Sequence, residues 1–267
     1  GESALALLDQ GLVDHVLTTN SGRVEELISY ASSHSDVQAH ATTKIKNIIL
    51  VFTDNGRKKM GLEQRRWLGQ QVREAFLEAY GTTLGYQGSL EFFPTLGEGG
   101  LSALQRKELD EVLNTLKPTD LPPVRISLLK AGNIEQWSEP ILKRVKAADL
   151  FLDRVIPDLH EYKNPSEMPD AFIAATDTGF MEDINLISYS LNAGYLGLKK
   201  SERAGWVKEY MEMPSKEERI AVLRDLHFNA LHNADIVPLV ISPFVALARK
   251  PWRMELSELY ANNQLWL

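Results

Sequence analysis

The sequence predicts an α/β fold, and three observations support this class. Short apolar, β-branched segments alternate along the chain with segments that have helical periodicity. Several of the helical segments begin with readable capping signals. The apolar content of 44% and the charged content of 24% are those of a globular protein with a sizeable core, and 267 residues suffice for one large domain or two small ones.

The first fifty residues alternate between predicted helices and strands. A short helix covers residues 4–8, and a strand covers residues 13–17. Ser21 is placed to cap the next helix, and two further strands are expected at 37–41 and 45–52. This order already indicates strands that return to one sheet.

A turn, a long helix and a loop follow. Residues 54–56 (Asp-Asn-Gly) are typical of a turn. Residues 62–80 place apolar side chains at the helical period, and Gly81 ends this helix. Residues 82–100 are rich in glycine and aromatic side chains. We expect an ordered loop there, because exposed aromatics such as Phe92 would be unfavourable.

The rest of the chain continues the same alternation. Ser102 with Gln105, and Ser215 with Glu218, have the spacing of capping boxes. The remaining predicted elements are helices near 103–116, 133–148, 183–192, 201–210 and 215–232, and strands at 124–129, 151–156, 171–175, 236–241 and 245–248.

Composition excludes several classes of protein. With 29 Lys and Arg against 36 Asp and Glu, the formal charge is −7, which disfavours a basic nucleic-acid binder. The absence of cysteine excludes disulfides, thiolate metal sites and a cysteine nucleophile. The longest apolar stretch, 236–248, contains prolines and is shorter than the ~20 residues of a membrane span. Residues 1–4 lack the basic and apolar regions of an export signal, although a signal upstream of a processed chain stays open.

Motifs for catalysis or cofactor binding are missing. We find no G-x-S-x-G, no G-x-x-x-x-G-K-[ST] and no H-E-x-x-H. Residues 97–100 (Gly-Glu-Gly-Gly) carry an acid and no lysine, so a flexible loop explains them better than a phosphate site. His227 and His232 are five residues apart, which places them on different faces of a helix. We therefore expect no cofactor and no metal site.

The segment 170–180 is the strongest candidate for a ligand site. A strand of small residues ends there in a polar turn, and ligands of open α/β sheets gather outside the carboxyl ends of strands. Asp177 could pair with a cationic group, and Phe180 offers an apolar contact. Alternatively, Asp177 only fixes the turn through its own backbone. Both interpretations stay open.

Several blocks of the sequence, in order, resemble the C-terminal half of the family-5 solute-binding proteins of ABC transporters, which include oligopeptide, dipeptide and nickel binders. Residues 9–14 resemble the entry of that half. The strand at 47–52 and the helix with Arg65 and Arg66 resemble its first strand and its following helix. The block from 214 to 239, a capped helix leading to Val-Pro-Leu, resembles its ending. Together the blocks cover nearly the whole chain.

The resemblance implies a lobe of the type II periplasmic-binding-protein fold, with a mixed sheet flanked by helices. Residues 46–235 would form the C-terminal ligand-binding lobe, and residues 1–45 and 236–267 would be flanking segments that return to a first lobe. The family's "W..DY" motif falls on residues 176–180, so the resemblance implies four ligand-binding residues: Thr176, Asp177, Gly179 and Phe180. Because Thr176 and Gly179 replace the family's Trp and Asp, peptide specificity is in question.

The resemblance also implies a function without catalysis. The chain would bind a small molecule or a peptide by closure of two lobes and deliver it to an ABC-transporter permease. It would act in the periplasm or at the cell surface and make no contact with nucleic acid. The main alternative is the ligand-sensing domain of a cytoplasmic transcriptional regulator with the same fold. A hydrolase with an unrecognised carboxylate pair is the second alternative.

Overall fold

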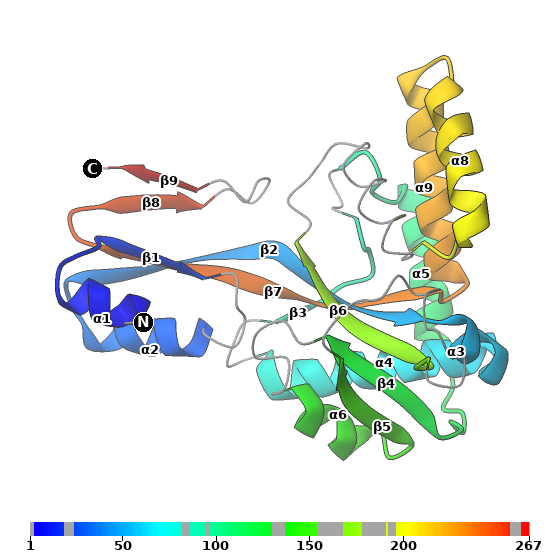
Figure 1. Ribbon diagram of the computed structural model, residues 1–267, viewed down its shortest axis with the longest axis horizontal. Helices are drawn as coiled ribbons and strands as arrows, with labels where there is room; N and C mark the ends of the chain where they lie inside the picture. Colours follow the sequence, from blue (N-terminus) through cyan, green and yellow to red (C-terminus); the bar gives the residue numbers. More distant parts are fainter. Residues whose placement is uncertain are drawn as a thin grey trace.

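The protein is a mixed α/β structure built around one seven-stranded sheet, as the computed structural model shows (Figure 1). This confirms the predicted fold class. The structure describes residues 3–18, 24–81, 86–93, 97–129, 137–153, 168–177, 191, 196–256 and 263–266.

Helices and strands alternate along most of the chain. The helices are α1 (Ala4–Asp9), α2 (Val24–Ser33), α3 (Asp54–Lys59), α4 (Leu62–Tyr80), α5 (Ala103–Asn114), α6 (Ser138–Arg144), α8 (Lys200–Glu212) and α9 (Lys216–His232). The strands are β1 (His15–Thr18), β2 (Val37–Phe52), β3 (Gln87–Gly88), β4 (Val124–Leu129), β5 (Ala148–Asp153), β6 (Ala171–Asp177), β7 (Ile236–Arg249), β8 (Arg253–Leu256) and β9 (Asn263–Trp266).

The sheet has both parallel and antiparallel pairs. Its strand order is β1-β7-β2-β6-β4-β5, and β3 pairs with β7. Strand β7 runs antiparallel to β1 and β2, and β6 runs antiparallel to β2. Strand β4 runs parallel to both β5 and β6. Strands β8 and β9 form a separate two-stranded sheet. The sheet is therefore mixed, as the family resemblance implies.

Strands β2 and β7 connect the two halves of the sheet (Figure 1). They pair along nearly their whole length, but the register shifts between Thr42 and Lys46 and again between Ile48 and Ile49. The sequence predicts two shorter strands in place of each. The prediction was wrong because irregular pairing shifts the register without ending either strand.

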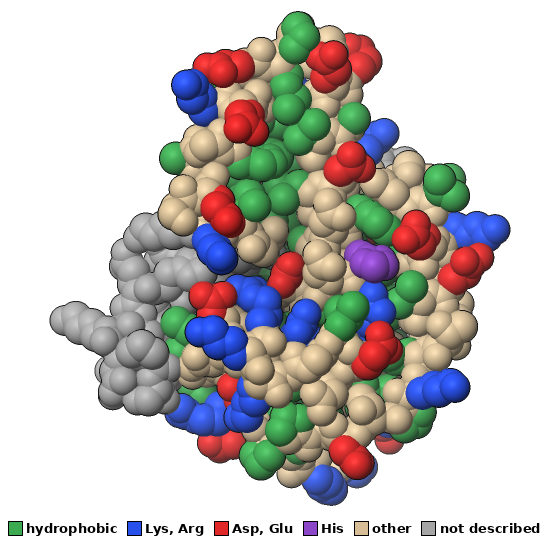
Figure 2. Space-filling model, turned by 90° about the vertical axis from the view of Figure 1, so that its right-hand side faces the viewer, with side chains coloured by type: hydrophobic (Ala, Val, Ile, Leu, Met, Phe, Trp, Pro, Cys, Tyr) green, Lys and Arg blue, Asp and Glu red, His purple; other side chains and the backbone are tan. Residues whose placement is uncertain are grey.

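Each half of the sheet has its own helices. Helix α2 packs on β2 and β7 beside β1, at the end where α1 lies. Helix α4 packs on β7 and on α6 in the other half. Helices α8 and α9 contact each other and project from the body, above a region where Lys and Arg side chains gather on the face in Figure 2.

The core includes the carboxyl-terminal part of β2. Its residues 48–52 are all buried, as are residues 171–174 of the neighbouring β6. Neighbours β7 and β6 pair with both edges of β2. Because successive side chains of a strand point to opposite faces and all five of these β2 residues are buried, both faces of β2 are covered here. The predicted burial of Phe92 and Phe93 in an ordered loop is confirmed.

Residues 54–56 do not form the predicted turn but begin helix α3. Thr53 caps this helix, and its hydroxyl accepts a hydrogen bond from the Gly56 N–H at 3.3 Å. Thr53 thereby makes the polar sequence a helix start. A Cβ on Gly56 would lie 2.0 Å from the Asp170 carbonyl oxygen, so only glycine allows this contact.

Two further helices differ from the prediction or lie outside the described residues. Helix α6 ends at Arg144, and Ala148 already belongs to β5, so the helix predicted near 133–148 ends earlier than expected. The predicted helix at 183–192 falls outside the described residues except at 191. Of the helices described, none is both long and apolar enough to cross a membrane.

Candidate ligand-binding site

The carboxyl end of β6 carries two of the four predicted site residues. Thr176 and Asp177 are its last residues, and they lie opposite Asn47 and Lys46 of β2. Gly179 and Phe180 lie outside the described residues. The structure therefore places the backbone of half the predicted site beside β2, next to the register shift in that strand.

Asn47 is a buried polar side chain at this position, and the sequence analysis missed it. It is 4% exposed, and its Nδ2 donates a hydrogen bond to the Phe92 carbonyl oxygen at 2.7 Å. Its Oδ1 is buried and has no partner in the described part of the chain. The sequence shows Asn47 only as a polar residue before the apolar run 48–52, and its contact with the distant Phe92 is visible only in the structure.

His227 of α9 fixes the loop that carries Phe92. Its Nε2 accepts hydrogen bonds from the backbone N–H groups of Phe92 at 3.0 Å and Phe93 at 3.4 Å. Because the Gly99 carbonyl can only accept, Nδ1 carries the ring proton and donates to it at 2.9 Å. Burial lowers the pKa of His227 to about 4, although the bond to Gly99 acts in the opposite direction. His227 is thus neutral and holds three backbone groups.

Glu91 and Gly99 make further contacts that stabilise this loop. Glu91 accepts hydrogen bonds from the Leu101 N–H at 2.9 Å and from Arg106 Nε at 2.6 Å. A Cβ on Gly99 would lie 2.5 Å from the Phe93 ring, so glycine permits close packing there. Glu98 pairs with Lys216. The string 97–100 therefore has a packing role, which differs from the flexible loop that the sequence predicts.

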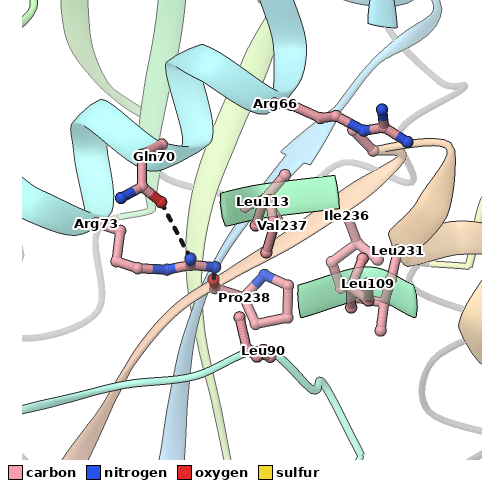
Figure 3. A pocket seen from close by; sticks show the side chains of 11 residues that line it. Arg66, Gln70, Arg73, Leu90, Leu109, Leu113, Leu231, Ile236, Val237 and Pro238 are labelled. Atoms are coloured by element: carbon pink, nitrogen blue, oxygen red, sulfur yellow. Dashed lines mark hydrogen bonds between the residues drawn. The ribbon is translucent and has the colours of Figure 1, made fainter. Parts of the chain in front are cut away.

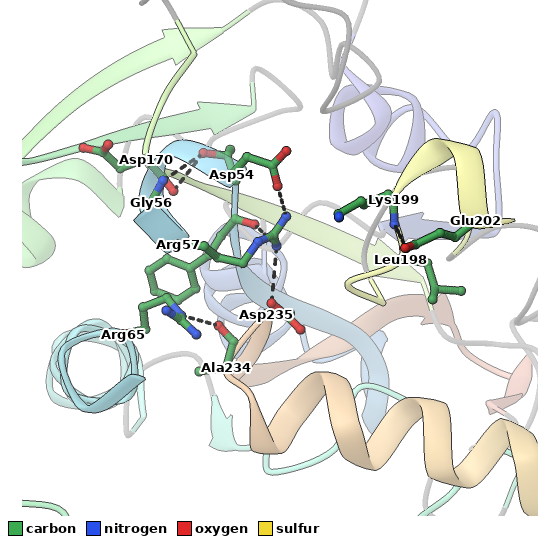
Figure 4. A network of polar contacts seen from close by, with 12 residues as sticks. Asp54, Gly56, Arg57, Arg65, Asp170, Leu198, Lys199, Glu202, Ala234 and Asp235 are labelled. Atoms are coloured by element: carbon green, nitrogen blue, oxygen red, sulfur yellow. Dashed lines mark hydrogen bonds and ion pairs between the residues drawn. The ribbon is translucent and has the colours of Figure 1, made fainter. Parts of the chain in front are cut away.

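The carboxyl end of β2, at Phe52, has a network of polar contacts (Figure 4). Arg57 of α3 donates to the Phe52 carbonyl at 2.8 Å and contacts Asp54 at 2.5 Å and Asp235 at 3.4 Å. Burial raises the pKa of Asp235, and the nearby charges of Arg57 and Arg65 act against this shift. The network joins α3 to the start of β7.

Helix α4 caps the end of α9 with two arginines. Arg65 donates to the carbonyls of Asn233 at 2.8 Å and Ala234 at 3.3 Å, and Arg66 donates to that of His232 at 2.7 Å. Positive charge is favourable at a helix C-terminus, where carbonyls lack partners. These contacts support Ala234, whose φ of 48° is the left-handed conformation that usually favours glycine.

Asp170, just before β6, joins α3 to the start of β4. It accepts hydrogen bonds from Lys59 Nζ and from the Arg125 backbone N–H, both at 2.8 Å. These residues line a basic cleft of about 350 Å³, together with Asn55, Lys58 and Met168. This cleft lies at the amino ends of β4 and β6, away from the predicted site.

A small apolar cavity lies between α4, α5, α9 and β7 (Figure 3). Its volume of about 20 Å³ holds about one water molecule, so it is too small for a solute. Arg73 reaches it and donates to the carbonyls of Pro238 at 2.6 Å and Leu239 at 3.2 Å. Burial lowers the pKa of Arg73 to about 10. Arg73 thereby satisfies the carbonyls where β7 shifts register.

The histidines of α9 have separate roles. His227 is buried in the loop contacts, whereas His232 lies 3.9 Å from Glu108 at the surface. Among the described residues, no group of three or more His, Asp or Glu side chains is arranged to hold a metal ion.

Comparison with known proteins finds relatives only by structure. No family model matches the sequence, and no curated protein matches it. The substrate-binding protein CtaP of an ABC transporter from Listeria monocytogenes has a similar structure, with a TM-score of 0.64 and 12% identity. The match covers 95% of this chain and 55% of that one.

Two further similar structures contain ligands. The dipeptide-binding protein from Pseudoalteromonas sp. SM9913, in complex with Met-Leu, has a TM-score of 0.65 and 11% identity, over 97% of this chain and 55% of that one. NikA from Staphylococcus aureus, in complex with Ni(L-His)2, has a TM-score of 0.57 and 11% identity, over 93% and 55%. The chain therefore spans about half the length of these proteins. It has the fold of the substrate-binding proteins of ABC transporters, as the sequence resemblance predicts.

Proposed function

We propose that the chain is the C-terminal ligand-binding part of a solute-binding protein and captures a small molecule or a peptide without catalysis. One observation carries the proposal: more than nine-tenths of the chain matches about half of such proteins. A match of this extent supports the proposal that residues 46–235 form the lobe that holds the solute and that the flanking segments join it to another lobe.

The hinge of this binding protein would lie in β2 and β7. Pairing between these strands is regular up to Thr42 and resumes at Lys46, opposite Phe244 and Ser242. The proposed lobe, 46–235, begins where pairing resumes, and residues 236–242 of β7 pair with its first strand. The flanking segments 1–45 and 236–267 would contribute to the other lobe. Loss of regular pairing supports bending at this point, because fewer ladder hydrogen bonds resist it.

Thr176, Asp177, Gly179 and Phe180 would contact the solute beside this hinge. The end of β6 lies next to the interrupted pairing, so closure of a second lobe would bury it. Delivery to a permease, and a location in the periplasm or at the cell surface, follow from the same proposal. The regulator alternative gains no support from the similar structures reported above.

Ligand binding to the native protein that contains this chain tests the proposal. Thermal shift with methionyl-leucine and with nickel–bis(L-histidine), followed by calorimetry, is expected to reveal reversible binding of at least one solute class. Ligand-induced closure is then measured as a decrease in the radius of gyration by X-ray scattering. Binding without compaction would contradict the hinge, and turnover of a bound solute would contradict the absence of catalysis.

A further inference from the structure

The basic cleft beside α3 carries more positive than negative side chains. It is lined by Asn55, Lys58 and Lys59 of α3, Arg125 of β4, and Met168 and Asp170 before β6. Three of these side chains are cationic and one is anionic, although the whole chain has a formal charge of −7. Helix α3 lies at the right of Figure 1, and Lys and Arg side chains gather on that side of the molecule in Figure 2. A local surplus of positive charge attracts anions even to an acidic protein.

A buried carboxylate holds two of the lining residues in place. Asp170 is 6% exposed, and its Oδ2 accepts hydrogen bonds of 2.8 Å from Lys59 Nζ and from the Arg125 backbone N–H. An ammonium group has three donors, so Lys59 keeps two after it binds Asp170. Because the charge of Lys59 balances that of Asp170, the positive charges of Lys58 and Arg125 are the surplus of the cleft.

These two cations have weak partners or none in the described part of the chain. Arg125 Nε lies 3.8 Å from Asp149, which is 74% exposed, and an exposed ion pair of this length contributes little. Arg125 Cζ lies 4.9 Å from the centre of the Phe151 ring, a contact that supports the face of the guanidinium while its N–H groups point outward from its edges. Lys58 makes no hydrogen bond or ion pair with the described residues. Both side chains therefore have donors to offer a ligand.

We propose that the basic cleft binds a phosphate group, either as inorganic phosphate or as part of a small phosphate ester. Phosphate offers at least three acceptor oxygens to the three cations, and guanidinium and ammonium groups are its usual partners. A carboxylate has only two oxygens and matches three cations less well. The cleft of about 350 Å³ lies in the size range of small-molecule sites, so it has room for a group attached to the phosphate.

This proposal does not depend on the proposed solute-binding function. The basic cleft lies at the start of β6, whereas Thr176 and Asp177 end that strand. Binding of phosphate and binding of a transported solute are therefore separate measurements, and either one can fail without the other.

Calorimetry on the native protein at constant ionic strength tests the proposal. Inorganic phosphate and methyl phosphate are the probes, and succinate is the carboxylate control. At about pH 8, where phosphate carries two charges, we expect both phosphate probes to bind with a Kd of about 1 mM or lower. Succinate should bind at least about fivefold more weakly, because it presents fewer oxygens at one point.

Two lysine variants locate the binding. Lys58→Ala removes a cation of the cleft, and Lys208→Ala removes a 75% exposed lysine of α8, so both change the net charge equally. We expect Lys58→Ala to weaken phosphate binding about fivefold or more, and Lys208→Ala to weaken it less than about twofold. Arg125→Gln, which retains the backbone N–H to Asp170, should also weaken binding about fivefold and decides in place of Lys58→Ala if that variant does not fold.

Three results would overturn the inference. The first is a lack of saturable binding of both phosphate probes by the native protein. The second is equal binding by the Lys58→Ala and Lys208→Ala variants, which would assign the effect to overall charge. The third is binding of succinate as tight as that of phosphate, which would reject the phosphate assignment.

Discussion

The polar groups around the carboxyl end of β2, at Phe52, differ from those around Asn47, which lies five residues earlier in the same strand. Near Phe52, the side chains of Arg57, Arg65 and Asp170 each have two or more partners from neighbouring elements. Near Asn47, the loop contacts are equally ordered, but one buried oxygen is left open. The contacts near Phe52 join α3 and α4 to the segments before β4 and β7. The region around Asn47 is ordered, but one of its buried hydrogen-bond acceptors has no partner among the described residues.

The paired polar groups near Phe52 and the unpaired oxygen near Asn47 are expected to contribute differently to stability and to binding. The polar groups near Phe52 are paired with neighbouring elements, whereas the buried Oδ1 atom of Asn47 has no hydrogen-bond partner among the described residues. An open buried acceptor also lowers the stability of the unliganded protein. The comparison therefore predicts large effects on stability at the Phe52 end and smaller effects, mainly on binding, near Thr176 and Asp177.

The largest effect is expected from Gly56→Ala at the paired end. The new Cβ would lie 2.0 Å from the Asp170 carbonyl oxygen, so α3 must move away from the loop before β6. We expect the free energy of unfolding to fall by about 3 kcal/mol, as for severe overpacking. Urea denaturation measures the change.

Gly205→Ala in α8 is the matched control. A Cβ on Gly205 would meet no atom within 4 Å in the described part of the chain, and alanine is favoured in a helix. The free energy of unfolding is expected to rise by about 0.5–1 kcal/mol. Effects of the same sign in both variants would show that the close contact at Gly56 does not limit stability.

The second prediction concerns His227 and pH. Burial lowers its pKa to about 4 in the folded protein, against an ordinary value of 6.5 in the unfolded chain. Between these values the unfolded chain binds more protons, so stability falls as the pH is lowered from 6.5 to about 4. The loss is about 3 kcal/mol when the window has been crossed. Urea denaturation at a series of pH values measures it.

His227→Gln provides the control for this pH dependence. Glutamine does not titrate, so the variant is less stable at pH 7 but lacks this part of the decline toward pH 4. Parallel stability curves for the native protein and the variant would mean that other groups cause the acid sensitivity. In that case His227 would not be the buried neutral anchor of the loop.

A third, smaller effect separates two aspartates near Arg125. Asp170 is buried and accepts two hydrogen bonds of 2.8 Å, from Lys59 and from the Arg125 backbone. Because Lys59 is 38% exposed, water moderates the pair, and we expect Asp170→Ala to cost about 2 kcal/mol in thermal or urea unfolding. Asp149, 74% exposed and 3.8 Å from Arg125, should change stability by less than about 0.5 kcal/mol when replaced by Ala. Similar losses for both would contradict the assigned importance of burial.

Much of the fold could be predicted because local signals and tertiary contacts agree. The helix at 62–80 has a clear apolar period, and α4 has the predicted bounds. Ser102 and Gln105 form the predicted capping box of α5. The predictions from sequence were wrong where contacts between residues distant in sequence determine the local structure. Gly56 is typical of a turn in its local sequence, but Thr53 caps a helix there. The glycine is required for close contact with Asp170, which is more than a hundred residues away.

The candidate site was less predictable than the fold. The carboxyl end of β6 could be chosen from general rules, and Thr176 and Asp177 do end that strand. Asn47 could not be identified, because its importance depends on the loop at Phe92 and on a missing partner. His227 was considered only as a metal ligand, since its three backbone contacts come from a segment more than a hundred residues earlier.

The smallest effect in this series is expected at Asp177, whose position rests on the sequence and on the backbone of β6. If its carboxylate meets a cationic group of the solute, Asp177→Ala should weaken binding by slightly more than about 1 kcal/mol, as for a charge-assisted hydrogen bond. Asp177→Asn keeps the shape and removes the charge, so it should weaken binding nearly as much. Calorimetry with methionyl-leucine, which carries an ammonium group, measures both. Unchanged affinity in both variants, with a lower unfolding temperature, would assign Asp177 to the turn.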